Sequence, residues 1–197
     1  MNLIKHKGFT VIEVSILLII FLIVAVLVVP LSLDDTMQAK NIARWRKVQY
    51  EFSNLLTSVQ VYSNNNESDF ETAFMNVLDN EIKSDISYRI TYFNGFTSSG
   101  VYKFDKMSLT YGGATIAVSM FDEVQDGNPI GALLYDVNGK KGPNTWGKDV
   151  FGYEIYEDKL IPFGKMKSVD EQKKDCSRNG TGVYCSNYYL IGGKFDR

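Results

Sequence analysis

The sequence predicts an α+β protein in which one long N-terminal helix is followed by an antiparallel sheet. Three observations lead to this fold class. Residues 14–33 contain no charged side chain, apolar residues recur at helical spacing after residue 35, and short strand-like segments alternate with turn residues after residue 87. A long helix followed by a run of strands is typical of an α+β domain.

The charge-free run is long enough to cross a membrane. As a helix, residues 9–33 would be about 37 Å long at about 1.5 Å per residue, and a bilayer core is about 30 Å thick. Lys5 and Lys7 precede the run, which predicts a cytoplasmic N-terminus with the rest of the chain on the far side. The alternative is a secretory signal, whose apolar core would be shorter, roughly 7 to 15 residues. Residues 28–35, VVPLSLDD, offer no Ala-x-Ala cleavage pattern for such a signal.

Residues 34–62 continue the helix with one apolar face. The residues that recur at spacings of three and four are Ile42, Trp45, Val48, Phe52, Leu55, Val59 and Tyr62. We therefore expect one helix over about residues 9–62, with its second half packed on a soluble domain. Pro30 lacks a backbone N–H, so a kink or local melting is expected there, although membrane helices tolerate proline.

Residues 63–197 are expected to form a globular α+β domain. A second helix is predicted over residues 70–82, capped by Ser68 or Asp69. Asn94-Gly95 and Gly112-Gly113 are turn pairs of the kind that join antiparallel strands. Strands are predicted at residues 88–93, 101–104, 107–111, 114–121, 130–135, 150–156, 159–163 and 188–191.

Residues 7–30, KGFTVIEVSILLIIFLIVAVLVVP, resemble the N-terminus of type IV prepilins and type II secretion pseudopilins. The family pattern is a basic leader ending in Gly, then an aromatic residue, Thr, two aliphatic residues and Glu, followed by an apolar helix. Residues 8–13 match this N-terminal methylation motif position for position, and Pro30 falls where many pilins carry a helix-bending proline. The close match covers roughly the first thirty residues, and the rest agrees with the family only in its architecture.

The resemblance implies a pilin-like fold. Residues 1–8 would be the leader peptide, 9–33 the transmembrane and filament-core helix, 34–62 its amphipathic continuation, and 63–197 the head domain on a C-terminal antiparallel sheet.

The resemblance also implies how the N-terminus is processed. A prepilin peptidase would cleave between Gly8 and Phe9 and methylate the new amino group of Phe9. Thr10 and Glu13 would serve assembly, with Glu13 paired to that amine, because an unpaired carboxylate in hydrocarbon costs several kcal/mol. The alternative for Glu13 is a side chain that reaches the membrane interface.

The implied function is that of a major or minor pilin, a structural subunit of a type IV pilus-like filament. The alternatives are a type II secretion pseudopilin, or an uncleaved single-pass membrane-tethered binding protein. The implied partners are copies of the chain and other pilins, the prepilin peptidase, the inner-membrane assembly platform and membrane lipid. The implied location is the bacterial inner membrane as a prepilin, and then an extracellular or periplasmic filament.

Composition and motifs argue against several other functions. With a net charge of −2, nucleic acid is not an expected partner. Arg44, Arg46 and Lys47 could meet anionic lipid or DNA, but such a stretch is more often the solvated or subunit-facing side of a helix. One histidine and two cysteines are too few for a Cys/His zinc site. An enzyme is not expected, because no nucleophile elbow, Walker loop or dinucleotide fingerprint occurs.

Cys176 and Cys185 bracket the turn pair Asn179-Gly180, so they can face one another across a loop. Disulfides persist outside the cytoplasm, where the predicted topology places this region. Pilins often close a C-terminal loop with one disulfide, which this pair resembles. The alternative is two free buried thiols.

Residues 136–149, DVNGKKGPNTWGKD, are rich in Asp, Asn and Gly. Asp136, Asn138, Asn144 and Asp149 could offer oxygens to calcium, and certain pseudopilins hold calcium in a C-terminal loop. The spacing is not that of an EF-hand. The alternative is a run of Asx turns, which explains these residues without an ion, so no cofactor is required.

Overall fold

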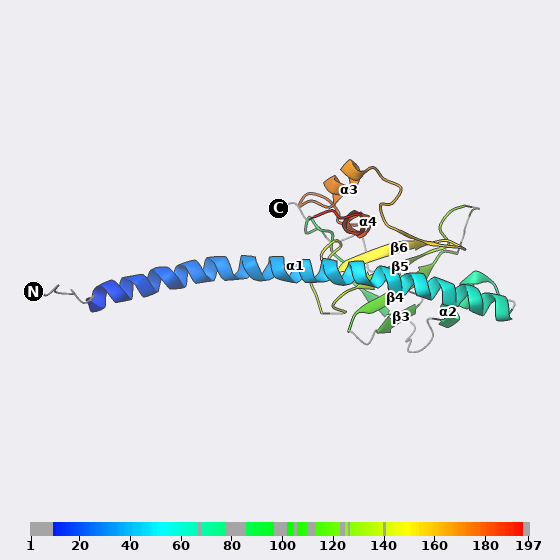
Figure 1. The fold of residues 1–197 in the computed structure, drawn as a ribbon, viewed down its shortest axis with the longest axis horizontal. Helices are drawn as coiled ribbons and strands as arrows, with labels where there is room; N and C mark the ends of the chain where they lie inside the picture. Colours follow the sequence, from blue (N-terminus) through cyan, green and yellow to red (C-terminus); the bar gives the residue numbers. More distant parts are fainter. Residues whose placement is uncertain are drawn as a thin grey trace, which may run out of the picture. The chain divides into compact units, whose positions relative to one another are not determined.

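The computed structural model describes residues 10–66, 68–77, 86–96, 102–104, 106–109, 113–122, 125, 127–139 and 141–194. The chain divides into two compact units, Met1–Ala39 and Lys40–Arg197. The first helix, α1 (Val11–Asn66), contributes to both units, and every other helix and strand assigned among the described residues belongs to the second (Figure 1). The described chain is α+β, which confirms the predicted fold class.

The first unit consists, as far as it is described, of the N-terminal part of α1. The stretch Val11–Val28 is long and apolar enough to cross a membrane, and none of its window is buried within the protein. Phe21 is 69% exposed and Val26 is 70% exposed. The core helix of a soluble protein would be mostly buried, so this stretch suits a membrane anchor or a signal sequence. Pro30 lies within α1, and the bend expected there stays a prediction.

In the second unit, residues 40–66 of α1 lie along the sheet. Trp45 stacks on Phe151 with ring centroids 5.0 Å apart, and Phe52 meets Tyr153 edge-on at 5.3 Å. All seven residues of the predicted apolar stripe belong to the core or pack against it: Trp45, Val48, Phe52 and Val59 are buried, and Ile42, Leu55 and Tyr62 are partly buried against them. The helical periodicity of the sequence therefore predicted the buried face of α1.

The sheet is antiparallel throughout, with its five strands side by side in chain order (Figure 1). These strands are β3 (Lys106–Leu109), β4 (Thr115–Met120), β5 (Gly131–Asp136), β6 (Val150–Ile155) and β7 (Leu160–Pro162). A separate two-stranded ribbon is formed by β1 (Ile86–Tyr88) and β2 (Tyr102–Phe104). The strands β2 to β7 correspond to predicted strands, with ends displaced by at most two residues.

Both faces of the sheet are covered. Successive side chains on a strand point to opposite faces, so Leu133 of β5 joins the core that contains α1, and Leu134 joins a second core on the other face. The second core also contains Ile90, Phe104 and Trp146. A polar side chain beneath the second core is therefore shielded from water. Asp136, two residues after Leu134 at the end of β5, is such a side chain.

The smaller helices agree only partly with the sequence prediction. The second helix, α2 (Phe70–Val77), is capped by Asp69, whose Oδ1 accepts the Thr72 N–H at 2.7 Å, and residues 78–82 lie outside the described residues. The helix α3 (Val169–Asp175) was not predicted. It starts at a capping box in which Ser168 and Glu171 bond reciprocally. The Ser-x-x-Glu pattern of residues 168–171 is a sequence signal that could have revealed it.

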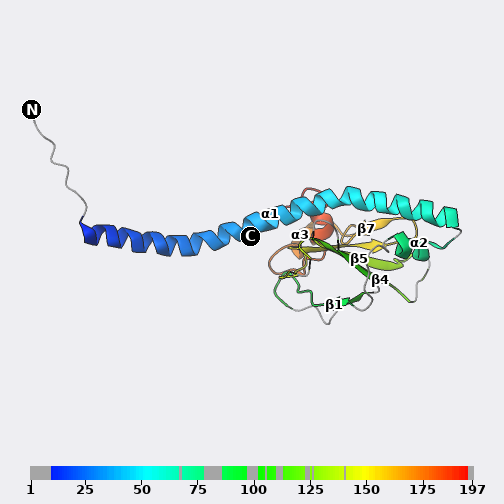
Figure 2. The ribbon, with the colours of Figure 1, turned by 90° about the horizontal axis from the view of Figure 1, so that it is seen from below.

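The predicted strand at residues 188–191 is wrong, because residues 188–190 belong to the helix α4 (Cys185–Leu190) and Ile191 caps it. Figure 1 labels α4 next to α3, and Figure 2 labels α3 as seen from below. A four-residue run of aromatic and aliphatic residues does not distinguish a buried strand from a buried helix. In the helix, Tyr189 packs against Phe151 with centroids 6.0 Å apart, and the Ser186 carbonyl accepts the Trp45 Nε1–H at 2.8 Å. Packing on α1 and β6 therefore decides the conformation.

The predicted strand at residues 88–93 is displaced. The strand β1 ends at Tyr88, and Thr91 instead forms a single bridge with Thr145. The Thr91 N–H donates to the Asn144 carbonyl, and the Thr91 carbonyl accepts the Trp146 N–H, both at 3.0 Å. Residues 144–146, which are distant in the sequence, thus form the backbone hydrogen bonds with Thr91 that a neighbouring strand would otherwise form. The turn expected at Asn94-Gly95 is present, with Gly95 at φ +86°.

Candidate functional site

Thr10 and Glu13 form a capping box at the start of α1. Glu13 Oε2 accepts the Thr10 N–H at 2.8 Å and the Thr10 hydroxyl at 2.9 Å, and the Glu13 N–H donates to Thr10 Oγ1 at 3.3 Å. The Thr-x-x-Glu pattern of residues 10–13 is a sequence signal for this arrangement. A carboxylate can accept about four hydrogen bonds, so Glu13 keeps room for a further donor. Gly8 and Phe9, the predicted cleavage residues, lie outside the described residues.

The second predicted site is the connection between β5 and β6, which we call the β5–β6 loop, residues 136–149. Asp136 ends β5, and its strand partner Val150 begins β6. The loop is closed next to the sheet, where the Val137 N–H donates to the Asp149 carbonyl at 2.8 Å. Asp136 and Asp149 are both 0% exposed. The fold therefore places two carboxylates side by side at one buried end of the sheet.

Asp149 organises the β5–β6 loop. Its Oδ1 accepts the Thr145 N–H at 2.5 Å, and its Oδ2 accepts the Asn144 N–H at 3.0 Å and an Nδ2–H of Asn138 at 3.2 Å. Asn144 adopts φ +48°, a left-handed conformation that asparagine tolerates better than most residues. One buried carboxylate thus fixes three other residues of the loop.

Several oxygens around Asp136 have no hydrogen-bond partner. Asp136 Oδ1 accepts the Asn138 N–H at 3.1 Å, which is the Asx turn that the sequence predicts. Within the described residues, Asp136 Oδ2, Asn138 Oδ1, Asn144 Oδ1 and, from β4, Thr115 Oγ1 are buried oxygens of this region without a hydrogen-bond partner. Turn chemistry therefore accounts for one oxygen of Asp136 and not for the others.

Thr115 belongs to the same place in the fold, although it is distant in sequence. It pairs with Asp136 across β4 and β5, and residues directly opposite in an antiparallel pair share one face of the sheet. A Cβ built on Gly139 would come within 3.4 Å of Thr115 Oγ1, so this hydroxyl lies beside the loop. Sequence reasoning missed Thr115, because only strand register brings it to Asp136.

The electrostatics of the site are unfavourable to two ionised carboxylates. Burial, followed by the charge of Asp149, raises the pKa of Asp136 to about 7. Burial also raises the pKa of Asp149, although the hydrogen bonds from Thr145, Asn138 and Asn144 oppose this. Among the described residues, no lysine or arginine forms an ion pair with either carboxylate. The described part of the chain therefore supplies no cation that would favour the ionised form of either carboxylate.

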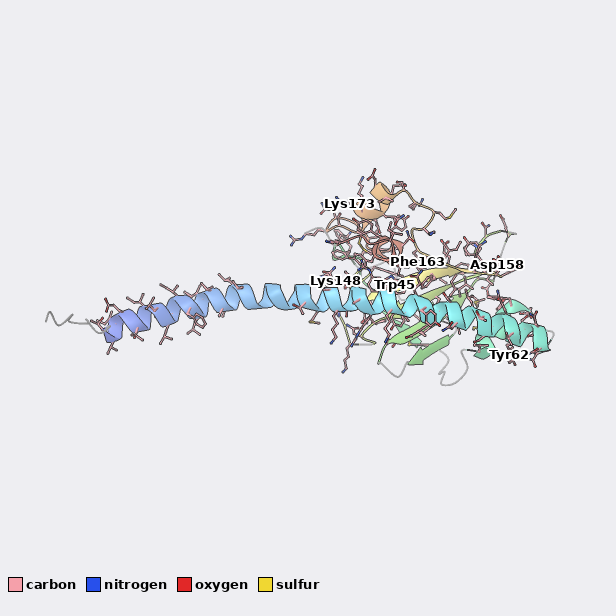
Figure 3. The ribbon with its side chains drawn as sticks, viewed as in Figure 1. Trp45, Tyr62, Lys148, Asp158, Phe163 and Lys173 are labelled. Carbon is pink, nitrogen blue, oxygen red and sulfur yellow. A yellow bond between two sulfur atoms is a disulfide. The ribbon has the colours of Figure 1, made fainter. Side chains whose placement is uncertain are left out.

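The helix α1 holds both ends of the β5–β6 loop. Asn41 Nδ2 donates to the Lys148 carbonyl at 3.2 Å, and Arg44 Nη1 donates to the Val137 carbonyl at 3.4 Å. Figure 3 labels Lys148 next to the part of α1 that carries Trp45. These two hydrogen bonds thus couple the conformation of the β5–β6 loop to the position of residues 41–44 of α1.

The other predicted features have structural roles. Arg46 donates to the carbonyls of Tyr189 at 2.7 Å and Gly193 at 3.2 Å, so with Arg44 it ties the basic stretch of α1 to the domain, while Lys47 is exposed. The predicted Cys176–Cys185 disulfide is confirmed, with its Cα atoms 5.0 Å apart.

The loop inside this disulfide is organised by Asp175. Its carboxylate accepts the Thr181 N–H at 2.9 Å and the Tyr184 N–H at 2.8 Å. The disulfide and Asp175 together join the end of α3 to the start of α4.

No protein-family model, curated protein or solved structure matches the chain. What the capping box and the β5–β6 loop do must therefore be argued from their own chemistry. The first places a carboxylate at the start of an exposed apolar helix. The second gathers two buried carboxylates with amide and hydroxyl oxygens, and the described residues hold no cluster of three or more His, Cys, Asp or Glu side chains.

Proposed function

We propose that the chain is a pilin-like structural subunit, a major or minor pilin of a type IV pilus-like filament. It would be made as a membrane-inserted precursor and cleaved between Gly8 and Phe9. One observation carries this proposal: Glu13 stands in the first turn of an apolar helix whose large side chains are exposed, and this helix begins directly after the sequence Lys-Gly-Phe-Thr. A carboxylate at this position needs a cationic partner if the helix is to leave water.

Cleavage would create that cation close to Glu13. The new amino group would belong to Phe9, and three backbone bonds separate its nitrogen from the Thr10 nitrogen. The Thr10 N–H already donates to Glu13 Oε2 at 2.8 Å. The geometry of the capping box therefore supports pairing within one subunit, and the free lone pairs of Glu13 also allow pairing with the amine of a neighbour. Such a pair sets the register between subunits more than it adds stability.

The remaining features support an anchored subunit with an external domain. The apolar stretch of α1 offers side chains for lipid in the membrane and for like helices in a filament, where close packing drives association. The disulfide suits a compartment outside the cytoplasm, which agrees with the topology expected from Lys5 and Lys7. We accordingly propose an inner-membrane precursor that passes into a periplasmic or extracellular filament, with a pseudopilin as the nearest alternative.

The N-terminus decides between this proposal and an uncleaved tethered protein. The measurement is intact-mass spectrometry of the chain purified from its host membrane, with Gly8→Leu as the control that blocks cleavage. We expect a chain that begins at Phe9 and carries one added methyl group. A native chain that retains residues 1–8 would refute the proposal.

Two variants then separate the charge of Glu13 from its capping role. Glu13→Gln keeps a side chain that serves in a capping box but removes the charge, and Glu13→Ala removes both. Both variants should be processed normally, and both should enter filaments at least about tenfold less, since a loss of about 1.4 kcal/mol in assembly has that effect. Wild-type incorporation of Glu13→Gln would show that the charge pair is not needed.

A further inference from the structure

We propose that the domain formed by residues 40–197 docks on the surface of an anionic phospholipid bilayer through a basic patch at α3. The inference rests on the membrane anchoring proposed for α1, and it does not depend on cleavage at Gly8 or on filament assembly. The patch combines the turn before α3 with exposed residues of the helix: Lys165, Met166, Lys167, Val169, Lys173 and Lys174.

Two apolar side chains of the basic patch are exposed among its lysines. Met166 is 80% exposed and Val169 is 57% exposed. Lys165 and Lys167 flank Met166 in the sequence, and Lys173 lies one helical turn from Val169 on the same face of α3. Apolar side chains surrounded by long cationic ones suit the boundary of a bilayer. The apolar atoms enter between the headgroups, and the ammonium groups meet the phosphates.

The carboxylates of this segment do not cancel its positive charge. Residues 163–178 contain five Lys and Arg side chains and three Asp and Glu side chains, so the segment keeps a net charge of +2. Glu171 is engaged by Ser168 in the capping box, and Asp175 accepts two backbone N–H groups of the loop that the disulfide closes. The lysines beside Met166 therefore remain available to anionic groups outside the protein.

The basic patch stands on a rigid base. The disulfide joins the residue after α3 to the first residue of α4, and Asn187 of α4 donates to Gln172 of α3 at 2.8 Å. The helix α4 is bonded in turn to α1, because the Ser186 carbonyl accepts the Trp45 Nε1–H at 2.8 Å. A surface that is already ordered loses little conformational entropy when it docks.

The basic patch belongs to the end of the domain that comes first along α1. Trp45, which bonds to α4, follows Val28 by about 25 Å of helix at about 1.5 Å per residue. Figure 3 shows Lys173 on the side of Trp45, and Asp158 on the side of Tyr62. A bilayer that holds the apolar stretch is thus tethered to the domain by the intervening part of α1. Docking on it is intramolecular, so a weak attraction is sufficient.

The other end of the domain has the opposite charge. An open cavity of about 600 Å³ there is lined by Asp69, Glu71, Glu157 and Asp158, together with Lys159, whose Nζ lies 3.6 Å from Asp158. At 0.1 M salt the Debye length is about 10 Å, which is less than the roughly 30 Å of α1 between the two ends. An anionic bilayer therefore attracts the basic patch, repels the acidic end and so orients the domain.

The test places the full chain in nanodiscs that hold one copy each, made of phosphatidylcholine alone or with about a third phosphatidylglycerol. Mass spectrometry measures how fast hydroxyl radicals oxidise Met166 and how fast Lys165 is acetylated. We expect both rates to fall at least about threefold in the anionic discs, and to recover in 1 M salt, where the Debye length is about 3 Å. Lys159, 54% exposed at the acidic end, should react equally in both lipids. Equal rates for Met166 and Lys165 in the two lipids would overturn the proposal.

A charge-reversal variant tests whether the lysines carry the contact. Lys165→Glu combined with Lys173→Glu changes two exposed positions, so the thermal midpoint should stay near that of the wild type. Met166 remains as the reporter, and its oxidation rate should become the same in both lipids. Lys159→Glu makes the same kind of charge change at the acidic end and should keep the wild-type protection. Protection that persists in the combined variant would overturn the proposal.

A second copy of the chain is the competing occupant, because its acidic cavity has the charge to receive the basic patch. Protection by a second copy would increase with the number of chains per vesicle and would not depend on lipid charge. That pattern would overturn the bilayer as the partner. The assay uses the uncleaved chain and does not measure assembly, so its failure is distinguishable from failure of the filament proposal, which the N-terminal mass decides.

Discussion

Trp45 packs α1 against the aromatic side chains of the sheet, and its replacement by alanine gives the sharpest test of this packing. The side chain is 0% exposed. Its ring lies 5.0 Å from Phe151 and 5.0 Å from Tyr153, and its Nε1–H donates to the Ser186 carbonyl at 2.8 Å. Alanine would remove the ring contacts and the hydrogen bond together.

The expected loss of unfolding free energy has two contributions, the lost ring contacts and the lost hydrogen bond. Truncating a buried Trp to Ala costs about 3–5 kcal/mol, because apolar burial is lost and a cavity is left. The Ser186 carbonyl also loses its donor, and a buried acceptor without a partner costs about 1–3 kcal/mol unless water enters the cavity. We therefore expect Trp45→Ala to lower the free energy of unfolding by about 4–6 kcal/mol. Trp45→Phe, which keeps most of the ring, should cost about 1–3 kcal/mol.

The assay is denaturant unfolding of the full chain in detergent micelles, followed by circular dichroism. Tyr50 provides the matched control, because it lies on the same helix, is also aromatic, and is 74% exposed. Tyr50→Ala should change the free energy of unfolding by no more than about 0.5 kcal/mol. If Trp45→Ala costs no more than Tyr50→Ala, the packing of α1 on the sheet is not a source of stability and the reasoning fails.

Two further predictions concern the disulfide and the buried carboxylates. Replacing Cys176 and Cys185 together by alanine should lower the free energy of unfolding by about 2.5–3 kcal/mol, since the disulfide closes a short loop of the unfolded chain. The measurement is denaturant unfolding, and a loss of less than about 1 kcal/mol would contradict this prediction. Because the pKa of Asp136 in the folded protein, about 7, is above its ordinary value of 3.8, its contribution to stability is complete below about pH 4 and is lost as pH rises through about 7. The wild-type protein should therefore lose a few kcal/mol of unfolding free energy between pH 4 and pH 7, and denaturation of Asp136→Asn should lack this decline.

The long helix and its buried face could be read from the sequence. Apolar residues at spacings of three and four from Ile42 to Tyr62 face one side of a helix whatever lies opposite, so all seven were placed correctly. The strands β2 to β7 were also found, because alternation and turn residues bound them locally. The segment at 188–191 was not, because a short apolar run carries no period, and contacts with Trp45 and Phe151 decide that it is helical.

Part of the β5–β6 loop could likewise be predicted from the sequence, and part depended on the tertiary structure. Its Asp and Asn residues were recognised from their density in the sequence, which favoured Asx turns over an ion as the explanation of them. Strand register added Thr115, and burial showed which oxygens the turns leave unpaired. Neither property is encoded locally, because both depend on a strand and a helix that are distant in the sequence.

The sequence by itself determined the apolar helix, the position of Glu13 at its start, and the alternating strands, since each depends on residues within a few positions of one another. Only the tertiary structure decided that α4 is a helix, that Asn41 and Arg44 hold the β5–β6 loop, and that two carboxylates are buried together there. The physical reason is that burial and hydrogen-bond satisfaction are properties of the packed chain. The same carboxylates in an open loop would be hydrated and ordinary in pKa.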